Sequence, residues 1–396
     1  MESNRIRFLS ATETLGGIKT IKIWNSELFS LGIFDQGSRE YSKSHAGHQT
    51  LGIIPGYIVE VVTQFDGYEK NIIQEVDGVH DLFISRKGMN PFVDLVTFSN
   101  LILTFFRSKP DLVLFFTIKP VIYGMLASRC FGIPSIPTIT GLGTIFIRES
   151  IVTRIVKRLY RIALFSASVV FFQNVDDEYL FIQQKLVDSD LCRLSPGSGV
   201  DLNAFPERTL EPSDNMTFLF IGRMLWDKGV REYVEAARVI KKKYPNVSFQ
   251  LLGPLGVENR TAITNSQMAE WQEEGFVEYL GATDNVAPYI ERACCVVLPS
   301  YREGTSRVLL ESAAMCRPLI ATDVPGCREV VDDGVTGLLC KPKDVVSLSQ
   351  KMEIMINLPH ETRVSMGKRG RQKIQNGFSE DIVCNLYIDA IKSAIS

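Results

Sequence analysis

The stretch Pro299-Ser-Tyr-Arg-Glu-Gly-Thr-Ser-Arg-Val-Leu-Leu-Glu311 decides the fold of this chain. It follows a short apolar run, residues 294–298, whose length fits a buried strand rather than a helix. Pro299 and Ser300 end that run. From about Ser306 to Met315 the apolar residues recur at helical spacing. The sequence therefore predicts a strand, a tight loop and a helix.

This arrangement favours an anion at the start of the helix. The N–H groups of Gly304, Thr305 and Ser306 are expected to lack partners inside the first turn, where the positive end of the helix dipole lies. A phosphate fits such a place. Glu303 stands at the lip of the loop, and Glu311 lies roughly 7 Å along the helix, within reach of a ribose. A carboxylate before a helix also stabilises the dipole without any ligand, so this pair does not decide the function alone.

A second loop carries two cations. Residues 217–221 read as a strand, and Gly222-Arg223-Met224-Leu225-Trp226-Asp227-Lys228-Gly229 follows it. Arg223 can engage two phosphate oxygens, while Lys228 acts as a point charge. Together they would neutralise a diphosphate without a metal. The alternative is that both are ordinary surface cations, as most Lys and Arg side chains are.

The composition is that of an ordinary globular protein long enough for two domains. The chain has 396 residues, of which 45% are hydrophobic and 22% charged, with a net charge of −2. A near-neutral charge argues against a nucleic-acid partner. Residues 1–20 lack an unbroken apolar core, so we expect no signal peptide, and no apolar run is long enough to span a membrane. Eight cysteines without a C-x-x-C spacing suit a reducing cytoplasm.

Short apolar runs alternate with amphipathic segments, which predicts parallel sheets covered by helices on both faces. The series breaks at residues 205–215, so we expect an N-terminal domain over 1–205 and a C-terminal domain over 206–375, both doubly wound and facing across a cleft. One option for the last helix, about 376–396, is to pack back on the first domain. The predicted strands are 6–9, 57–63, 111–116, 135–139, 168–172, 217–221, 247–252, 277–280, 294–298 and 319–321.

The motifs together resemble those of the family-4 retaining glycosyltransferases, which have the GT-B fold. In that family an R-x4-K pair binds the donor diphosphate and an E-x7-E motif holds the nucleotide sugar; Arg223/Lys228 and Glu303/Glu311 stand in those places. The resemblance covers roughly residues 82–396 and is stronger in the second half. Further matching stretches are 196–201, 251–254, 277–281, 323–329 and 333–339.

Stretches of the first domain resemble a bacterial subgroup that extends polyprenyl-diphosphate-linked sugars for surface polysaccharides. They are residues 86–91, 117–120 and 140–143. The resemblance implies that Lys119, Gly141 and Gly143 serve the acceptor or a phosphate. It also implies that Gly16 and Gly17 lie near the donor phosphates.

The resemblance implies a hexosyltransferase that moves a hexose or N-acetylhexosamine from a UDP-sugar to a lipid-diphosphate-linked glycan, with retention of configuration. Arg223, Lys228 and Glu303 are the expected catalytic residues. We expect no metal and no cofactor, and we interpret Asp188-Ser-Asp190 as a turn rather than a metal motif. The expected donor-binding residues are Gly16, Gly17, Gly222, Ala282, Gly304, Thr305, Ser306 and Glu311.

Two other functions stay open at this point: a UDP-sugar 2-epimerase of the same architecture, and a catalytically inactive partner subunit. An acid/base residue would be needed for the first, and His45 and His48 are the histidines in the least legible region, residues 18–56. Residues 148–168 mix cations with apolar residues. Such a helix can lie on an anionic membrane surface, or pack as an ordinary helix with a solvated face.

Overall fold

The computed structural model describes residues 6–12, 57–63, 78–82, 91–142, 146, 150–212, 215–257, 259 and 261–395. The chain divides into two compact units. Unit 1 comprises Met1–Ser198 and Asp381–Ser396, and unit 2 comprises Gly199–Glu380. Among the helices described, none is long and apolar enough to cross a bilayer.

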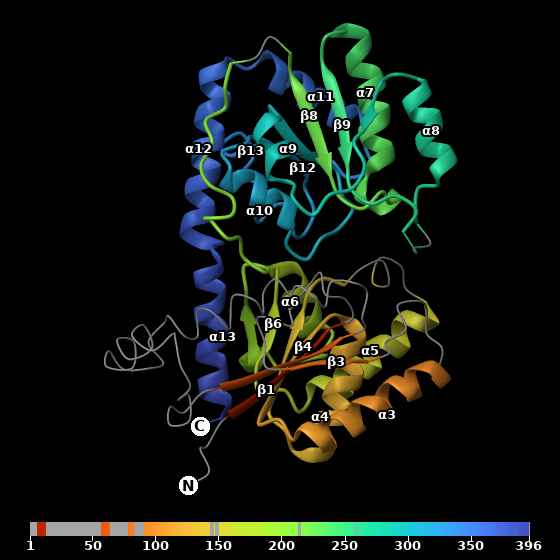
Figure 1. Cartoon of the computed structure of the whole chain (residues 1–396), viewed down its shortest axis with the longest axis vertical. Helices are drawn as coiled ribbons and strands as arrows, with labels where there is room; N and C mark the ends of the chain where they lie inside the picture. Colours follow the sequence, from red (N-terminus) through yellow and green to blue (C-terminus); the bar gives the residue numbers. More distant parts are fainter. Residues whose placement is uncertain are drawn as a thin grey trace, which may run out of the picture. The chain divides into compact units, whose positions relative to one another are not determined.

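Unit 1 is built on a seven-stranded parallel sheet with the order β3-β2-β1-β4-β5-β6-β7 (Figure 1). Its helices include α3 (Pro91–Ser108), the π-helix η3 (Pro120–Gly124), α4 (Met125–Phe131), α5 (Ile151–Leu164) and α6 (Val175–Gln183). The strands are β1 (Ile6–Thr12), β2 (Tyr57–Thr63), β3 (Gly78–Asp81), β4 (Leu112–Phe116), β5 (Ser135–Ile139), β6 (Val170–Phe172) and β7 (Cys192–Leu194).

Strand β4 shows how unit 1 buries both faces of its sheet. Val113 and Phe115 pack into the core on the side of α3, η3, α4, α5 and α6. Their neighbours Leu112, Leu114 and Phe116 pack into a second core. Successive side chains of a strand point to opposite faces, so an all-apolar strand needs a cover on each side. The C-terminal helix α13 (Glu380–Ile395) supplies the second cover.

Unit 2 repeats the architecture with a six-stranded parallel sheet in the order β10-β9-β8-β11-β12-β13. The strands are β8 (Thr217–Ile221), β9 (Ser248–Leu252), β10 (Glu278–Tyr279), β11 (Cys295–Leu298), β12 (Leu319–Thr322) and β13 (Gly337–Cys340). The helices are η6 (Trp226–Lys228), α7 (Val230–Lys243), α8 (Asn265–Glu273), α9 (Ala287–Arg292), α10 (Arg307–Ala314), α11 (Val345–Asn357) and α12 (His360–Gly377).

The observed units differ from the expected domains at their boundaries. The first unit ends at Ser198 rather than at residue 205, and the last segment to join it begins at Asp381 rather than at about residue 376. The reason is local: Val200 donates to Phe378 O, and Glu380 donates to Val200 O, so residue 200 pairs with the end of α12 in unit 2. Short strands β3, β7 and β13 were not predicted.

Several predicted features lie outside the described residues. They are the paired glycines Gly16 and Gly17, the histidines His45 and His48, and Gly143.

Candidate functional site

The predicted strand–loop–helix is present, and its loop meets the loop after β8. Strands β8 and β11 are parallel neighbours in the sheet, so their carboxyl ends reach the same edge. There the Nζ atom of Lys228 lies 2.5 Å and 2.7 Å from the two carboxylate oxygens of Glu303. The side chains are 22% and 13% exposed, respectively. A partly desolvated ion pair therefore joins the R-x4-K and E-x7-E loops.

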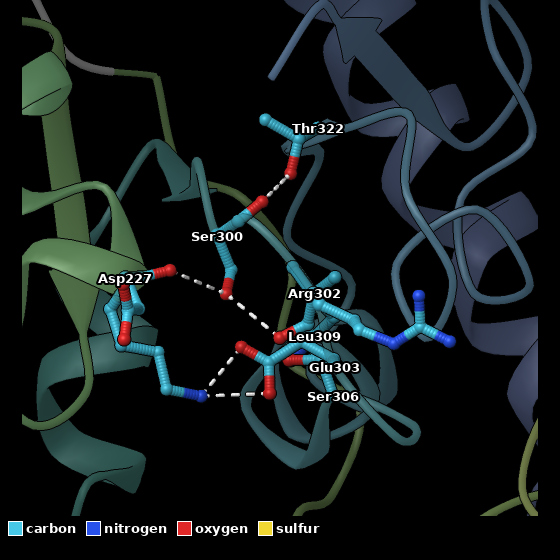
Figure 2. Close-up of polar contacts among 8 residues, drawn as sticks. Asp227, Ser300, Arg302, Glu303, Ser306, Leu309 and Thr322 are labelled. Carbon is cyan, nitrogen blue, oxygen red and sulfur yellow. Dashed lines mark hydrogen bonds and ion pairs between the residues drawn. The ribbon is translucent and has the colours of Figure 1, made fainter. Parts of the chain in front are cut away.

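Backbone contacts hold these two loops together. Gly229 has φ +74°, and a Cβ atom there would lie 2.1 Å from the carbonyl oxygen of Pro299. The Tyr301 N–H donates to Asp227 O over 2.9 Å, and the Ser300 hydroxyl donates to the same oxygen over 3.3 Å. Figure 2 shows Ser300 between Asp227 and the loop that carries Glu303. The close approach requires a glycine, because a side chain would clash with the neighbouring backbone.

The loop after β12 supports the Glu303 loop from its other side. The Glu303 N–H donates to Pro325 O over 3.0 Å, and the Ser306 N–H donates to Gly326 O over 2.8 Å. Gly326 has φ +82°, and a Cβ atom there would lie 2.4 Å from Gly304 O. The Ser306 N–H has no partner inside the first helical turn, as predicted, but it donates to a carbonyl of another loop. The tertiary fold supplies an acceptor that no property of the helix itself indicates.

Helix α10 begins one residue later than predicted, at Arg307, with Ser306 as its N-cap. Four N–H groups at a helix start have no acceptor within the helix. Of these, Ser306 donates to Gly326 O and Leu309 donates to the Ser306 hydroxyl; Arg307 and Val308 are the other two. Glu311 is 5% exposed, and its Oε1 atom accepts from Arg307 Nε over 2.7 Å. Glu311 thus lies one turn into the helix as expected, with one oxygen oriented by Arg307.

A buried carboxylate behind these loops escaped the sequence analysis. Glu232, in the first turn of α7, is 8% exposed, and its Oε1 atom accepts from the Tyr301 hydroxyl over 2.7 Å. Burial raises the pKa of Tyr301 well above its ordinary value, and the hydrogen bond to Glu232 adds to the rise. The hydroxyl thus stays protonated and donates. An acidic residue three positions into a helix is too common a pattern to reveal this contact in advance.

Gly222 and Arg223 lie on the loop after β8, and Ala282 lies on the loop after β10. Arg223 is exposed, and within the described part of the chain no side chain pairs with its guanidinium group. Gly222 donates to Leu252 O, which ties the loop after β8 to the end of β9. Ala282 is exposed just after Gly281, whose carbonyl accepts from Gly253 N–H over 2.8 Å.

No thiolate is available near Lys228 and Glu303. Cys327 is fully buried behind them, and burial raises the pKa of its thiol well above the ordinary value. The negative charge of Glu303 raises this pKa further. A thiol held neutral is a poor nucleophile.

Lys119 forms an ion pair inside unit 1. It follows β4, but its Nζ atom lies 2.8 Å from Asp94 Oδ1, with side chains 13% and 6% exposed. Tyr123 donates to the other oxygen of Asp94 over 2.9 Å. Helix α3 thus brings a carboxylate to Lys119, and the role of Lys119 toward an acceptor or a phosphate stays a prediction. Gly141 follows β5 with φ +111°.

The Asp188-Ser-Asp190 stretch forms a 3-10 turn over Ser189–Leu191. Asp188 Oδ1 accepts from the Asp190 N–H over 3.3 Å, so the first carboxylate caps the turn.

Comparison with known proteins finds one family model that matches most of unit 2. Residues 203–373, which contain Lys228, Glu303 and Glu311, match the family described as Glycosyl transferases group 1. A Campylobacter jejuni relative, "N,N'-diacetylbacillosaminyl-diphospho-undecaprenol alpha-1,3-N-acetylgalactosaminyltransferase", is 26% identical over 77% of this chain and 82% of its own. The Staphylococcus aureus "Capsular polysaccharide biosynthesis glycosyltransferase CapM" is 26% identical over 75% and 80%, respectively.

Solved structures show the same fold along the whole chain. HepE from Anabaena, crystallised with UDP-glucose, aligns with a TM-score of 0.76 at 17% identity, over 98% of this chain and 100% of its own. A glycosyltransferase from Rickettsia africae aligns with a TM-score of 0.74 at 18% identity, over 99% of each chain. The predicted GT-B fold with two Rossmann-like domains is confirmed. The comparisons give no support to the epimerase or to the inactive subunit.

Proposed function

The chain carries a group 1 glycosyltransferase domain and is a transferase enzyme, and from this premise we propose that it moves a hexose or N-acetylhexosamine from a UDP-sugar to a lipid-diphosphate-linked glycan. The observation that carries the proposal is the contact between Lys228 and Glu303 at the carboxyl ends of β8 and β11. Ligands of open parallel sheets bind at that edge.

The proposed donor lies with its diphosphate against Lys228 and Arg223. Breaking the bond between the sugar and the diphosphate builds negative charge on the leaving group. Fixed cations that face this charge stabilise the transition state more than the ground state. Glu303, which pairs with Lys228 before the diphosphate binds, would orient the sugar, and Glu311 would accept from the ribose. The proposal needs no metal, because the two cations and the start of α10 supply the positive charge.

The acceptor class rests on the relatives. The names of the C. jejuni and S. aureus relatives specify a diphospho-undecaprenol-linked sugar and capsular polysaccharide biosynthesis. We assign this chain an acceptor of that chemical class, a role in polysaccharide biosynthesis, and retention of the anomeric configuration. Such an acceptor is anchored in a bilayer, so we place the enzyme in the cytoplasm, at the inner face of the membrane, as a peripheral protein.

The test is a transfer assay with purified full-length chain, a panel of UDP-sugars and a synthetic lipid-diphosphate sugar. Proton NMR of the product reads the anomer. We expect an α-linked product from an α-linked donor, and undiminished turnover in the presence of a chelator. An inverted product contradicts retention, and loss of turnover with the chelator contradicts metal independence. A donor epimer formed without acceptor would instead favour the isomerase.

A further inference from the structure

Unit 1 exposes apolar side chains on the solvent sides of two helices. On α3 they recur at helical spacing over the length of the helix: Leu95, Val96, Leu103 and Phe106 are 61%, 50%, 44% and 64% exposed. Helix α5 and the residue that caps its C-terminus expose a second set, Ile151, Val152, Ile155, Ile162 and Phe165. A surface helix normally turns its polar residues to the solvent. Contiguous exposed apolar side chains mark an interaction surface.

A groove opens between these two sets. Helix α4 contacts both α3 and α5, and Figure 1 shows the three helices grouped in unit 1. The groove has a volume of about 710 Å³ and an apolar lining. Its one acid, Asp94, is neutralised by Lys119 and accepts from Tyr123, so the groove presents no free negative charge. The lining residues are Pro91, Asp94, Leu95, Phe98, Tyr123, Leu126, Arg129, Cys130 and Leu159.

The charges free on the three helices that line the groove have a single sign. Helices α3, α4 and α5 contain no acid other than the neutralised Asp94. Arg107, Arg129, Arg154 and Arg158 are exposed on them. Basic residues interleaved with apolar ones fit a surface that is apolar beneath a layer of negative charge. A two-fold contact with a second copy would instead bring the same cations against one another.

We propose that α3, α4 and α5 form the face by which this protein docks on an anionic bilayer, with the groove receiving a hydrocarbon chain from it. The proposal rests on the proposed function only in giving a lipid-linked acceptor as the reason for docking. The sequence indicated a membrane-binding helix only at residues 148–168, which contain α5; the structure adds α3, α4 and the groove between the helices.

The first test measures co-sedimentation of the full chain with vesicles of phosphatidylcholine containing phosphatidylglycerol. We expect Arg154→Gln with Arg158→Gln to weaken binding about fivefold for each cation removed. The charge-matched control is Lys242→Gln with Lys368→Gln, two exposed lysines of unit 2.

In the same assay, we expect Leu95→Glu with Phe106→Glu to weaken vesicle binding at least about tenfold. Its control is Val346→Glu with Ile354→Glu on α11, which are 65% and 45% exposed. Equal loss in variants and controls overturns the proposal.

The second test uses a thiol that the groove already contains. Cys130 lines the groove and is exposed, while the other seven cysteines are buried. An environment-sensitive fluorophore on Cys130 should shift to the blue when vesicles are added, and lipids brominated on their acyl chains should quench it. Emission that stays unchanged while the protein sediments with vesicles overturns the groove assignment. A blue shift on concentrating the protein without vesicles, with a doubled mass by light scattering, assigns the face to a second copy instead.

A third measurement separates this proposal from the proposed function. Transfer to a short-chain, water-soluble diphosphate acceptor needs no bilayer, so we expect the α3 and α5 variants to retain it. Vesicle binding without transfer to either acceptor would contradict the proposed function and leave the docking face standing. If the wild-type chain transfers sugar but does not bind anionic vesicles, the docking face is contradicted and the proposed function stands.

Discussion

Lys228 bonds both carboxylate oxygens of Glu303, so a diphosphate that binds Lys228 competes with that carboxylate. In the proposed mechanism this exchange would free Glu303 to accept from the hydroxyl groups of the sugar. In the absence of a ligand, each of the two charges compensates the other. An unpaired charge at this partly buried position would destabilise the fold. It also brings together, before the donor binds, two groups to which the proposed reaction gives a role.

We expect Lys228→Ala to lower turnover by about 10²- to 10³-fold, because the leaving diphosphate loses a fixed cation. Steady-state transfer from the UDP-sugar measures the loss, and circular dichroism checks that the fold survives. Lys242→Ala, an exposed lysine of α7, is the control. Turnover of Lys228→Ala close to that of the control would falsify the role given to Lys228. Arg223→Ala, tested alongside it, is expected to behave in the same way.

At the same scale, we expect Tyr301→Phe to destabilise unit 2 by about 1–3 kcal/mol, because it removes the donor to a buried carboxylate. The other oxygen of Glu232 already has no hydrogen-bond partner among the described residues. Urea unfolding measures the stability, and KM for the UDP-sugar reports the position of the Glu303 loop. Tyr289→Phe, a half-buried tyrosine of α9, is the control. Equal urea midpoints for the two variants would show that the hydrogen bond from Tyr301 to Glu232 contributes nothing to stability.

At the scale of elements, the site is assembled by loops that touch through glycines. Gly229 places the loop after β8 against Pro299, and Gly326 places the loop after β12 against Gly304. Each contact is backbone to backbone, so the geometry depends on the absence of a side chain rather than on a particular one. The strand order, with β11 between β8 and β12, brings these three loops to one edge.

Two glycines with the same φ angle distinguish the effect of backbone strain from the effect of a steric clash. Gly229 and Gly275 both have φ +74°, but a Cβ atom at Gly275 meets nothing within 4 Å. Gly275→Ala should therefore cost only the left-handed backbone strain, about 1–2 kcal/mol. Gly229→Ala adds a clash with Pro299 O, and we expect both a lower melting temperature and weaker donor binding. Calorimetry and a donor titration measure the two. Equal losses at both positions would mean that the contact with Pro299 plays no part.

At the scale of the molecule, α13 returns to the first unit after the chain has completed the second. Tyr387 anchors it: its hydroxyl lies 2.6 Å from that of Thr138, and its ring centroid lies 4.3 Å from that of Phe171. Without this helix one face of the first sheet would expose Leu112, Leu114 and their neighbours. The two units are therefore joined twice by the chain, at residues 198–199 and 380–381.

We expect Tyr387→Ala to destabilise unit 1 by about 3 kcal/mol or more, the usual effect of removing a large buried ring. Hydrogen exchange should rise at the amides of β4 and β5 and stay unchanged in β11 and β12, which belong to the other unit. Lys392→Ala, an exposed residue of the same helix, is the control. Unchanged exchange in β4 and β5 would contradict the anchoring role of Tyr387.

The sequence by itself determined the alternation of strands and helices, the positions of Arg223, Lys228 and Glu303 after strands, and their resemblance to glycosyltransferase motifs. These properties are local, because a run of apolar residues and a fixed spacing can be read without knowing what packs against them. Only the tertiary structure decided which groups meet. It paired Lys119 with Asp94, gave the Ser306 N–H a carbonyl from another loop, and placed Glu232 under Tyr301. Such partners are far apart in the chain, and parallel strand order rather than spacing brings them together.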